Sequence, residues 1–180
     1  MLKDILIGNI GFLVLAAALM GWARWRTRPG PLFTGPCPVG PAFKGWLINI
    51  WLVGLVLPVV TLAIGWSSPL TRLALIPYLL MFAVQVLFEL VAWKRWGSPV
   101  WVIVPCLFLP WRLFQIWSGL QLGDHAGLTQ ITLYALFVLW VINIGVHYTN
   151  IPNTMRWNQH PADTRFPSLN DPRVFVKDAQ

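Results

Sequence analysis

The chain has few charged residues, and acidic ones are the scarcest of all. Only 6 of its 180 residues are Asp or Glu, and charged residues make up 11% of the sequence. Soluble domains usually carry roughly a quarter. Hydrophobic residues make up 57%, so most of the surface must face something other than water. This composition excludes an ordinary soluble catalytic domain and predicts an integral membrane protein.

Sequence motifs for catalysis and metal binding are also lacking. No Ser lies in a nucleophile elbow, no paired His motif is present, and no Gly-rich phosphate loop follows a strand. Cys37 and Cys106 are too few and too far apart for a disulfide framework or a metal site. The three histidines share no ligand spacing, so we predict no metal site. Glu89 is the one acid in a confident apolar run, which argues against a transporter that relays protons through carboxylates.

The net charge of +7 does not indicate nucleic-acid binding. The basic residues lie in short groups at the ends of apolar runs, as Arg24 and Arg26 do, or Lys94 and Arg95. Basic residues at such positions set the orientation of membrane helices. We therefore expect the bilayer and other membrane proteins, rather than nucleic acid, as partners.

Apolar runs long enough to cross a bilayer occur five times. About 20 mostly apolar residues are needed, because a helix rises 1.5 Å per residue through about 30 Å of hydrocarbon. The predicted spans cover about 5–23, 46–66, 73–92, 99–120 and 129–147. The fourth contains Pro105, Pro110 and Arg112, so a full span kinked at its prolines, a re-entrant segment and an interfacial helix all remain open.

Basic residues favour the full span and orient the bundle. With five spans, ten of them fall on one side, and only Lys3 and Arg72 lie opposite. The ten are Arg24, Arg26, Arg28, Lys44, Lys94, Arg95, Arg156, Arg165, Arg173 and Lys177. With four spans the tail would change sides and most of this asymmetry would vanish. The prediction is an all-α bundle over 1–149, with the N-terminus outside and the C-terminus on the cytoplasmic side.

Two segments are expected to lie outside the bundle as extended chain. Residues 29–45 repeat a Gly-Pro start three times, which is unfavourable in a helix because proline lacks the N–H donor. The tail, 150–180, is rich in proline and has little periodicity. Both carry spaced aromatic residues that suit docking on a partner, although a solvated terminus is the plain alternative. These residues are Phe33, Phe43, Trp157, Phe166 and Phe175.

Polar residues inside the spans are the candidate site, because each is costly to place in hydrocarbon. The third span has polar and aromatic residues at helical spacing along one face, and the fifth span has a similar series. Such a group would bind a lipophilic ligand with a polar head or supply an imidazole to a pigment metal. Alternatively, Glu89 pairs with Lys94 or Arg95, and His147 caps its span. The candidates are Gln85, Glu89, Trp93, Trp140, Asn143 and His147, with Asn49 from the second span.

Arg112 is a separate candidate because its charge lies well inside the fourth span. At 1.5 Å per residue it falls near 20 Å from the inner end, too far for a direct pair with Glu89. The carbonyls freed by Pro105 and Pro110 are possible acceptors. Gln115, a partner's carboxylate or phosphate, and snorkelling to the outer interface are the alternatives.

These features predict a non-enzymatic accessory subunit that docks on a larger membrane complex, respiratory or photosynthetic, through its Gly-Pro loop and tail. A second hypothesis is a small module that binds a sterol, carotenoid or tetrapyrrole in the inner leaflet, with the pigment or lipid unidentified. A third is a membrane enzyme using Glu89 and His147 as acid and base. A bacterial inner, thylakoid or organellar membrane fits each of them.

Overall fold

The computed structural model describes residues 2–26, 41–95, 100–123 and 127–155, and these are helical apart from short turns. Five helices in it are long and apolar enough to cross a membrane. No strand occurs in these ranges. A membrane-embedded, all-helical, Trp-rich protein is therefore confirmed at this level, as far as length and composition can establish it.

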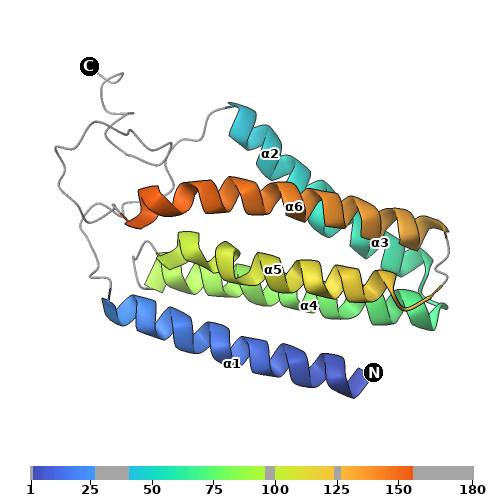
Figure 1. Ribbon diagram of the computed structural model, residues 1–180. Coiled ribbons are helices and arrows are strands. Elements are labelled where there is room, and N and C mark those ends of the chain that lie inside the picture. The colour runs from blue at the N-terminus through green and yellow to red at the C-terminus, as the bar shows by residue number, and fades with distance from the viewer. Residues whose placement is uncertain (1, 27–40, 96–99, 124–126, 156–180) are drawn as a thin grey trace.

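The helices run back and forth through the bundle (Figure 1). Their order along the chain is α1 (Leu2–Arg26), α2 (Pro41–Trp51), α3 (Leu57–Ile64), α4 (Pro69–Leu90), α5 (Val100–Leu120) and α6 (Gly127–Met155). Two π-helical segments extend this set, namely η1 (Leu52–Val56) between α2 and α3, and η2 (Val91–Arg95) after α4. Together, α2, η1 and α3 form the second of the five predicted spans.

The described helix ends differ from the predicted ones for local reasons. The second span begins at Pro41, inside the segment 29–45 that was expected to be extended, because proline fits the first turn of a helix. Ser68 caps α4 by accepting a hydrogen bond from the Thr71 amide at 3.3 Å, and Pro69 follows it. The last helix continues to Met155, so the beginning of the predicted tail is also helical. Residues 27–40 and 156–180 lie outside the described residues.

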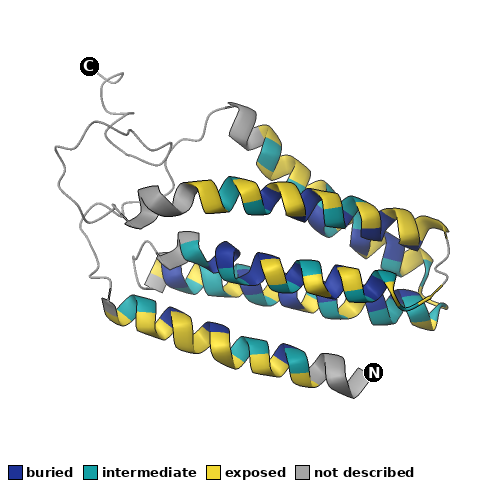
Figure 2. Ribbon diagram, in the orientation of Figure 1, coloured by how far each residue is buried: buried dark blue, intermediate teal, exposed yellow. Residues whose placement is uncertain are grey.

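The centre of the bundle is formed by α4, α5 and α6, with the α2–α3 span packed on one side and α1 on the other (Figure 1). Half of the α5 span is buried, compared with 17% of the α1 span. Figure 2 shows the consequence, because dark blue residues concentrate on the central helices while α1 is mainly yellow. The buried side chains are therefore held mainly by α4, α5 and α6.

Threonine pairs join the helices near one end of the bundle. Thr61 and Thr132 connect α3 to α6 through hydroxyls 2.7 Å apart. The hydroxyls of Thr71 and Thr129 connect α4 to α6 at 2.9 Å. All four side chains are at most 2% exposed. A hydroxyl can donate or accept, so in each pair one hydroxyl donates to the other within the bundle.

Candidate functional site: an arginine enclosed in the bundle

Arg112 lies inside α5 with 1% of its surface exposed. Its Nη2 donates to the side-chain oxygen Oε1 of Gln85 on α4 at 2.6 Å, and Gln85 Nε2 donates to Oε1 of Glu89 at 2.6 Å. Gln85 therefore bridges the cation and the carboxylate. A glutamine can do so because its amide accepts at one end and donates at the other.

Aromatic rings surround the rest of the guanidinium. Its Cζ atom lies 4.5 Å from the ring centroid of Phe82, 4.4 Å from that of Trp140 and 5.8 Å from that of Tyr78. Among the described residues, the Nε and Nη1 atoms have no hydrogen-bond partner. The negative faces of these rings attract the cation, so this aromatic cage accounts for how α5 holds a charge at its centre.

A second network fixes the cage in position. Pro58 has no N–H and cannot donate to the carbonyl of Gly54, four residues earlier, as a residue of an α-helix would. The hydroxyl of Tyr78 donates to that carbonyl, and the Trp140 indole donates to the Tyr78 oxygen at 3.1 Å. A Cβ added at Gly54 would lie 2.9 Å from the Trp140 ring. Glycine is therefore needed here for the close approach of the indole.

Pro110 on α5 repeats the arrangement. It removes the donor for the carbonyl of Cys106, and the hydroxyl of Tyr148 on α6 donates to that oxygen at 2.9 Å. The carbonyl freed by Pro110 is thus used by a tyrosine rather than by Arg112, contrary to one of the expected arrangements. The hydrogen-bond partner of Arg112 is Gln85, rather than Gln115 or the outer interface.

The predicted site residues are only partly brought together. Gln85, Glu89 and Trp140 join the surroundings of Arg112. Asn143 is 2% exposed and accepts a hydrogen bond from the Trp46 indole at 3.0 Å. His147 is half-buried on α6, and Asn49 is exposed on α2.

Glu89 accepts a hydrogen bond from Gln85, and its use together with His147 as acid and base stays a prediction. The remaining candidates lie in parts of the chain, or carry side chains, outside the described residues. These are Trp93, Phe33, Phe43, Trp157, Phe166 and Phe175.

A separate polar contact attaches α1 and was missed from the sequence. The side-chain oxygen of Asn9 accepts hydrogen bonds from the Trp111 indole at 3.0 Å and from Gln115 Nε2 at 2.8 Å. Phe12 stacks on Trp111 with ring centroids 5.0 Å apart. The signal available in the sequence was an amide alone in an apolar run, which needs a partner in hydrocarbon.

The described ranges hold no cluster of three or more His, Cys, Asp and Glu residues that would ligate a metal ion. The arrangement around Arg112 is therefore an enclosed charge in an aromatic cage, with its polar contact made to protein. Comparisons of the chain with protein-family models, with curated proteins and with solved structures found no match.

Proposed function

We propose that the protein is a non-enzymatic integral membrane subunit that docks on a larger membrane complex, such as a respiratory or photosynthetic one. The observation that supports this best is the line from Arg112 through Gln85 to Glu89, in which the Arg112 guanidinium is enclosed among aromatic rings. In a transporter or membrane enzyme, intramembrane charges face a water-filled path or a substrate. Here the cation faces other side chains, an arrangement that stabilises a rigid helical body.

Docking is assigned to the Gly-Pro loop and the tail. The C-terminal end of α1, the start of α2 and the end of α6 share one end of the bundle (Figure 1), so both segments emerge there. Aromatic side chains spaced along a proline-rich chain suit shallow pockets on a partner. The prolines reduce the conformational entropy lost on docking.

The proposal includes an orientation, with the N-terminus outside, the C-terminus on the cytoplasmic side and α5 as a full crossing kinked at its prolines. It rests on the ten basic residues that the five-span prediction assigns to one side of the membrane, against two on the other. Single cysteines at positions 124 and 177, in a chain carrying Cys37→Ser and Cys106→Ala, should react with an impermeant thiol reagent from opposite sides. Reaction from the same side would overturn the five-span orientation.

Purification of the tagged chain in mild detergent tests docking. Replacing Trp157, Phe166 and Phe175 together by alanine should reduce co-purifying membrane subunits while leaving the melting temperature of the bundle unchanged. A matched control replaces Asn158 and Ser168 in the same tail, and the partners should be retained. If the aromatic variant keeps every partner at wild-type stoichiometry, docking through the tail is wrong.

A second candidate function is binding of a pigment or other lipophile near the inner end of α6. The observation that favours it is His147, whose imidazole is half-buried one turn after Asn143 and has no hydrogen bond to described residues. An absorbance band in the purified protein that disappears in His147→Ala but persists in His125→Ala would support it. A colourless preparation with no extractable lipophile would exclude it.

A further inference from the structure

The two halves of the second span are attached to the bundle to different degrees. In α3, Pro58 and Thr61 are buried, and the helix packs against α4 and α6. In α2, none of the described side chains, residues 45–51, is buried. Among the described residues, the extensive backbone contacts of α2 are with η1, and α2 diverges from α6 toward its start (Figure 1). One half of this span is therefore held firmly by its neighbours, and the other half is held loosely.

The two halves meet at a segment suited to bending. Five residues, Leu52–Val56, form the π-helix η1, and Pro58 follows it. Sharp bends in helices occur mainly at π-helical segments and at prolines. The middle of η1 is fixed to the bundle, because the Tyr78 hydroxyl donates to the Gly54 carbonyl and the Trp140 ring lies close to Gly54. The span therefore has a fixed point at Gly54, from which α2 extends.

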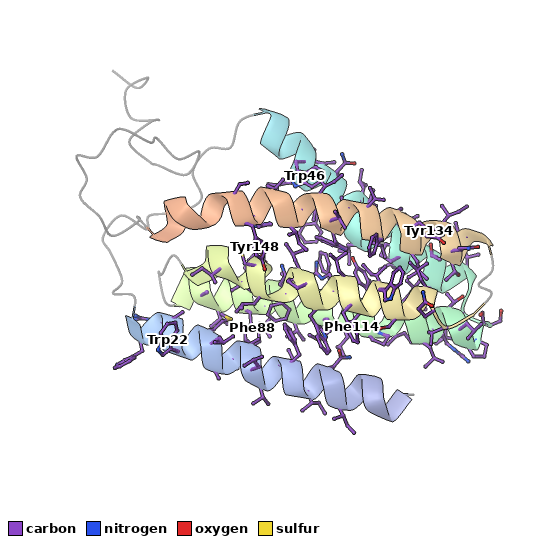
Figure 3. All side chains as sticks on the ribbon, in the orientation of Figure 1. Trp22, Trp46, Phe88, Phe114, Tyr134 and Tyr148 are labelled. Carbon is purple, nitrogen blue, oxygen red and sulfur yellow. The ribbon has the colours of Figure 1, made fainter. Side chains whose placement is uncertain are left out.

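One hydrogen bond joins α2 to α6 within the part of the chain that the structure describes. The indole of Trp46, labelled in Figure 3, donates to Oδ1 of Asn143 at 3.0 Å. Trp46 and Ile50 also pack against the buried core of the bundle, but both are only half-buried. Hydrogen bonds between membrane helices are weak on average, because polar groups find other partners when helices separate. This contact can therefore open without unfolding the bundle.

We propose that α2 is a hinged arm that pivots at η1, with the hydrogen bond between Trp46 and Asn143 as its latch. In the closed state the bonded Asn143 is 2% exposed. In the open state Asn143 loses its donor and α2 moves away from α6, while α3 and the cage around Arg112 stay in place. Elements that open locally are those with few buried apolar contacts, and α2 is such an element.

The hinge also bears on docking. The arm begins at Pro41, within the Gly-Pro segment 29–45, so its position sets where that segment meets the bundle. A partner that binds the segment more tightly in one position of the arm would shift the arm to that position. This consequence rests on the proposed docking function, whereas the hinge itself does not.

Distances between two spin labels on the full-length protein in lipid nanodiscs test the hinge. The labels are attached to Ile48→Cys on α2 and Ile142→Cys on α6, which are exposed positions, in a chain that carries Cys37→Ser and Cys106→Ala. Pulsed electron paramagnetic resonance measures the distance distribution. The closed arm should give one distance, and the open arm should give a second, longer one.

Two variants weaken the latch to different extents. Trp46→Phe removes the hydrogen bond and keeps an aromatic ring, and it should raise the ratio of open to closed arm about threefold. Trp46→Ala also removes the packing of the ring and should raise this ratio about tenfold. Leu47→Ala changes a neighbouring exposed residue of α2 and should leave the ratio unchanged.

A reference pair of labels separates hinging from a loss of structure. It is placed at Val60→Cys on α3 and Ile131→Cys on α6, both exposed, and its distance should be the same in every variant because α3 is bonded to α6 through Thr61. An α2–α6 distance that stays single and unchanged in Trp46→Ala would overturn the hinge. A change at both pairs would also overturn it, because the whole second span would then be moving. No partner is present in these measurements, so their result does not depend on the docking proposal.

Discussion

Arg112 and Gln115 lie one turn apart on α5, but their surroundings differ. The side chain of Arg112 bonds to α4 and packs on Trp140 of α6, within the most buried part of the bundle. Gln115 bonds to Asn9 of α1 and borders a pocket, with one oxygen unpaired. Where four spans converge, polar groups are enclosed. Where a single peripheral helix is added, the fit is looser and a small pocket remains.

The difference indicates two levels of stability. The α4–α6 centre is fixed by hydrogen bonds and close packing. The contacts of α1 include the amide of Asn9, the stacking of Phe12 on Trp111 and a small cluster around Ala16 and Met20. Polar contacts are strengthened where water is absent. We therefore expect variants at the centre to affect the whole bundle and variants at α1 to affect that helix alone.

Replacing Arg112 with leucine should have the largest effect. The change removes a charged hydrogen bond and the contacts with the aromatic rings, and it leaves the Gln85 oxygen unpaired, so we expect a loss of about 3 kcal/mol in the free energy of unfolding. Equilibrium unfolding in detergent micelles would measure it. Arg112→Leu combined with Gln85→Leu should recover part of the loss. Wild-type stability of the single variant would show that the cage does not hold the bundle together.

The matching experiment on α1 is Asn9→Leu, which removes the two hydrogen bonds that Asn9 accepts from Trp111 and Gln115. We expect the melting temperature of the remaining bundle to change little. Met20 is 2% exposed. In a chain that also carries Met20→Cys, the reaction of this cysteine with a thiol reagent should become faster as α1 detaches. A cooperative loss of the whole bundle would instead show that α1 belongs to the centre.

A methyl group at Gly54 should have the next largest effect. Gly54→Ala places a Cβ 2.9 Å from the Trp140 ring, and displacing the indole also disturbs Tyr78 and Arg112. We expect a loss of about 2 kcal/mol, as for other overpacked cores. Gly145→Ala on α6, where no atom lies within 4 Å of the new Cβ, is the matched control and should be neutral or slightly stabilising. Equal effects of the two changes would contradict the close approach.

Tyr78 and Tyr148 each donate to a carbonyl that lies four residues before a proline. Removing their hydroxyls should reduce stability by different amounts, because one side chain is buried and the other is exposed. Tyr78→Phe leaves the Gly54 carbonyl unpaired in the core, and we expect a loss of about 1–2 kcal/mol. Tyr148 is 43% exposed, so Tyr148→Phe should cost less. Adding Pro58→Ala to Tyr78→Phe restores a backbone N–H four residues after Gly54, and partial recovery is expected. No recovery would mean that the freed carbonyl is not the origin of the loss.

The number of helices long and apolar enough to cross a membrane was readable from the sequence, because bilayer thickness sets the length of an apolar run. The stripe containing Gln85 and Glu89 was also predictable, since it depends on spacing along one helix. Its partner was not, because the contact with Arg112 depends on how α4 and α5 lie side by side. The estimate that Arg112 lies too far from Glu89 for a direct pair neglected the reach of a glutamine placed between them.

The contacts of Tyr78 and Tyr148 were not predicted, but the positions of two prolines in the sequence indicate them. Pro58 and Pro110 each mark a carbonyl four residues earlier that needs an outside donor, and both donors are tyrosines on other helices. Proline position predicts that a donor is needed, but only tertiary packing decides which residue supplies it. The unpaired oxygen of Gln115 is invisible to sequence reasoning for the same reason, because it depends on how Asn9 orients the amide.

Removing a hydroxyl from one of the threonine pairs should cause the smallest loss in the free energy of unfolding among these variants. Thr132→Val removes one hydroxyl of the pair with Thr61 at nearly constant volume. Interhelical hydrogen bonds in membranes average about 0.6 kcal/mol, because polar groups find other partners when helices separate. The remaining hydroxyl can turn to a carbonyl of its own helix, so we expect a loss near that size in the same micelle unfolding assay.

Thr149→Val is the control for that change. Its hydroxyl already bonds to the Gly145 and Val146 carbonyls within α6 and is exposed, so removing it breaks no contact between helices. We expect no measurable change in the free energy of unfolding. If Thr149→Val cost as much as Thr132→Val, the effect would reflect the threonine side chain within α6 rather than the contact between α3 and α6. The threonine pairs would then not be among the interactions that make the centre of the bundle more stable than its edge.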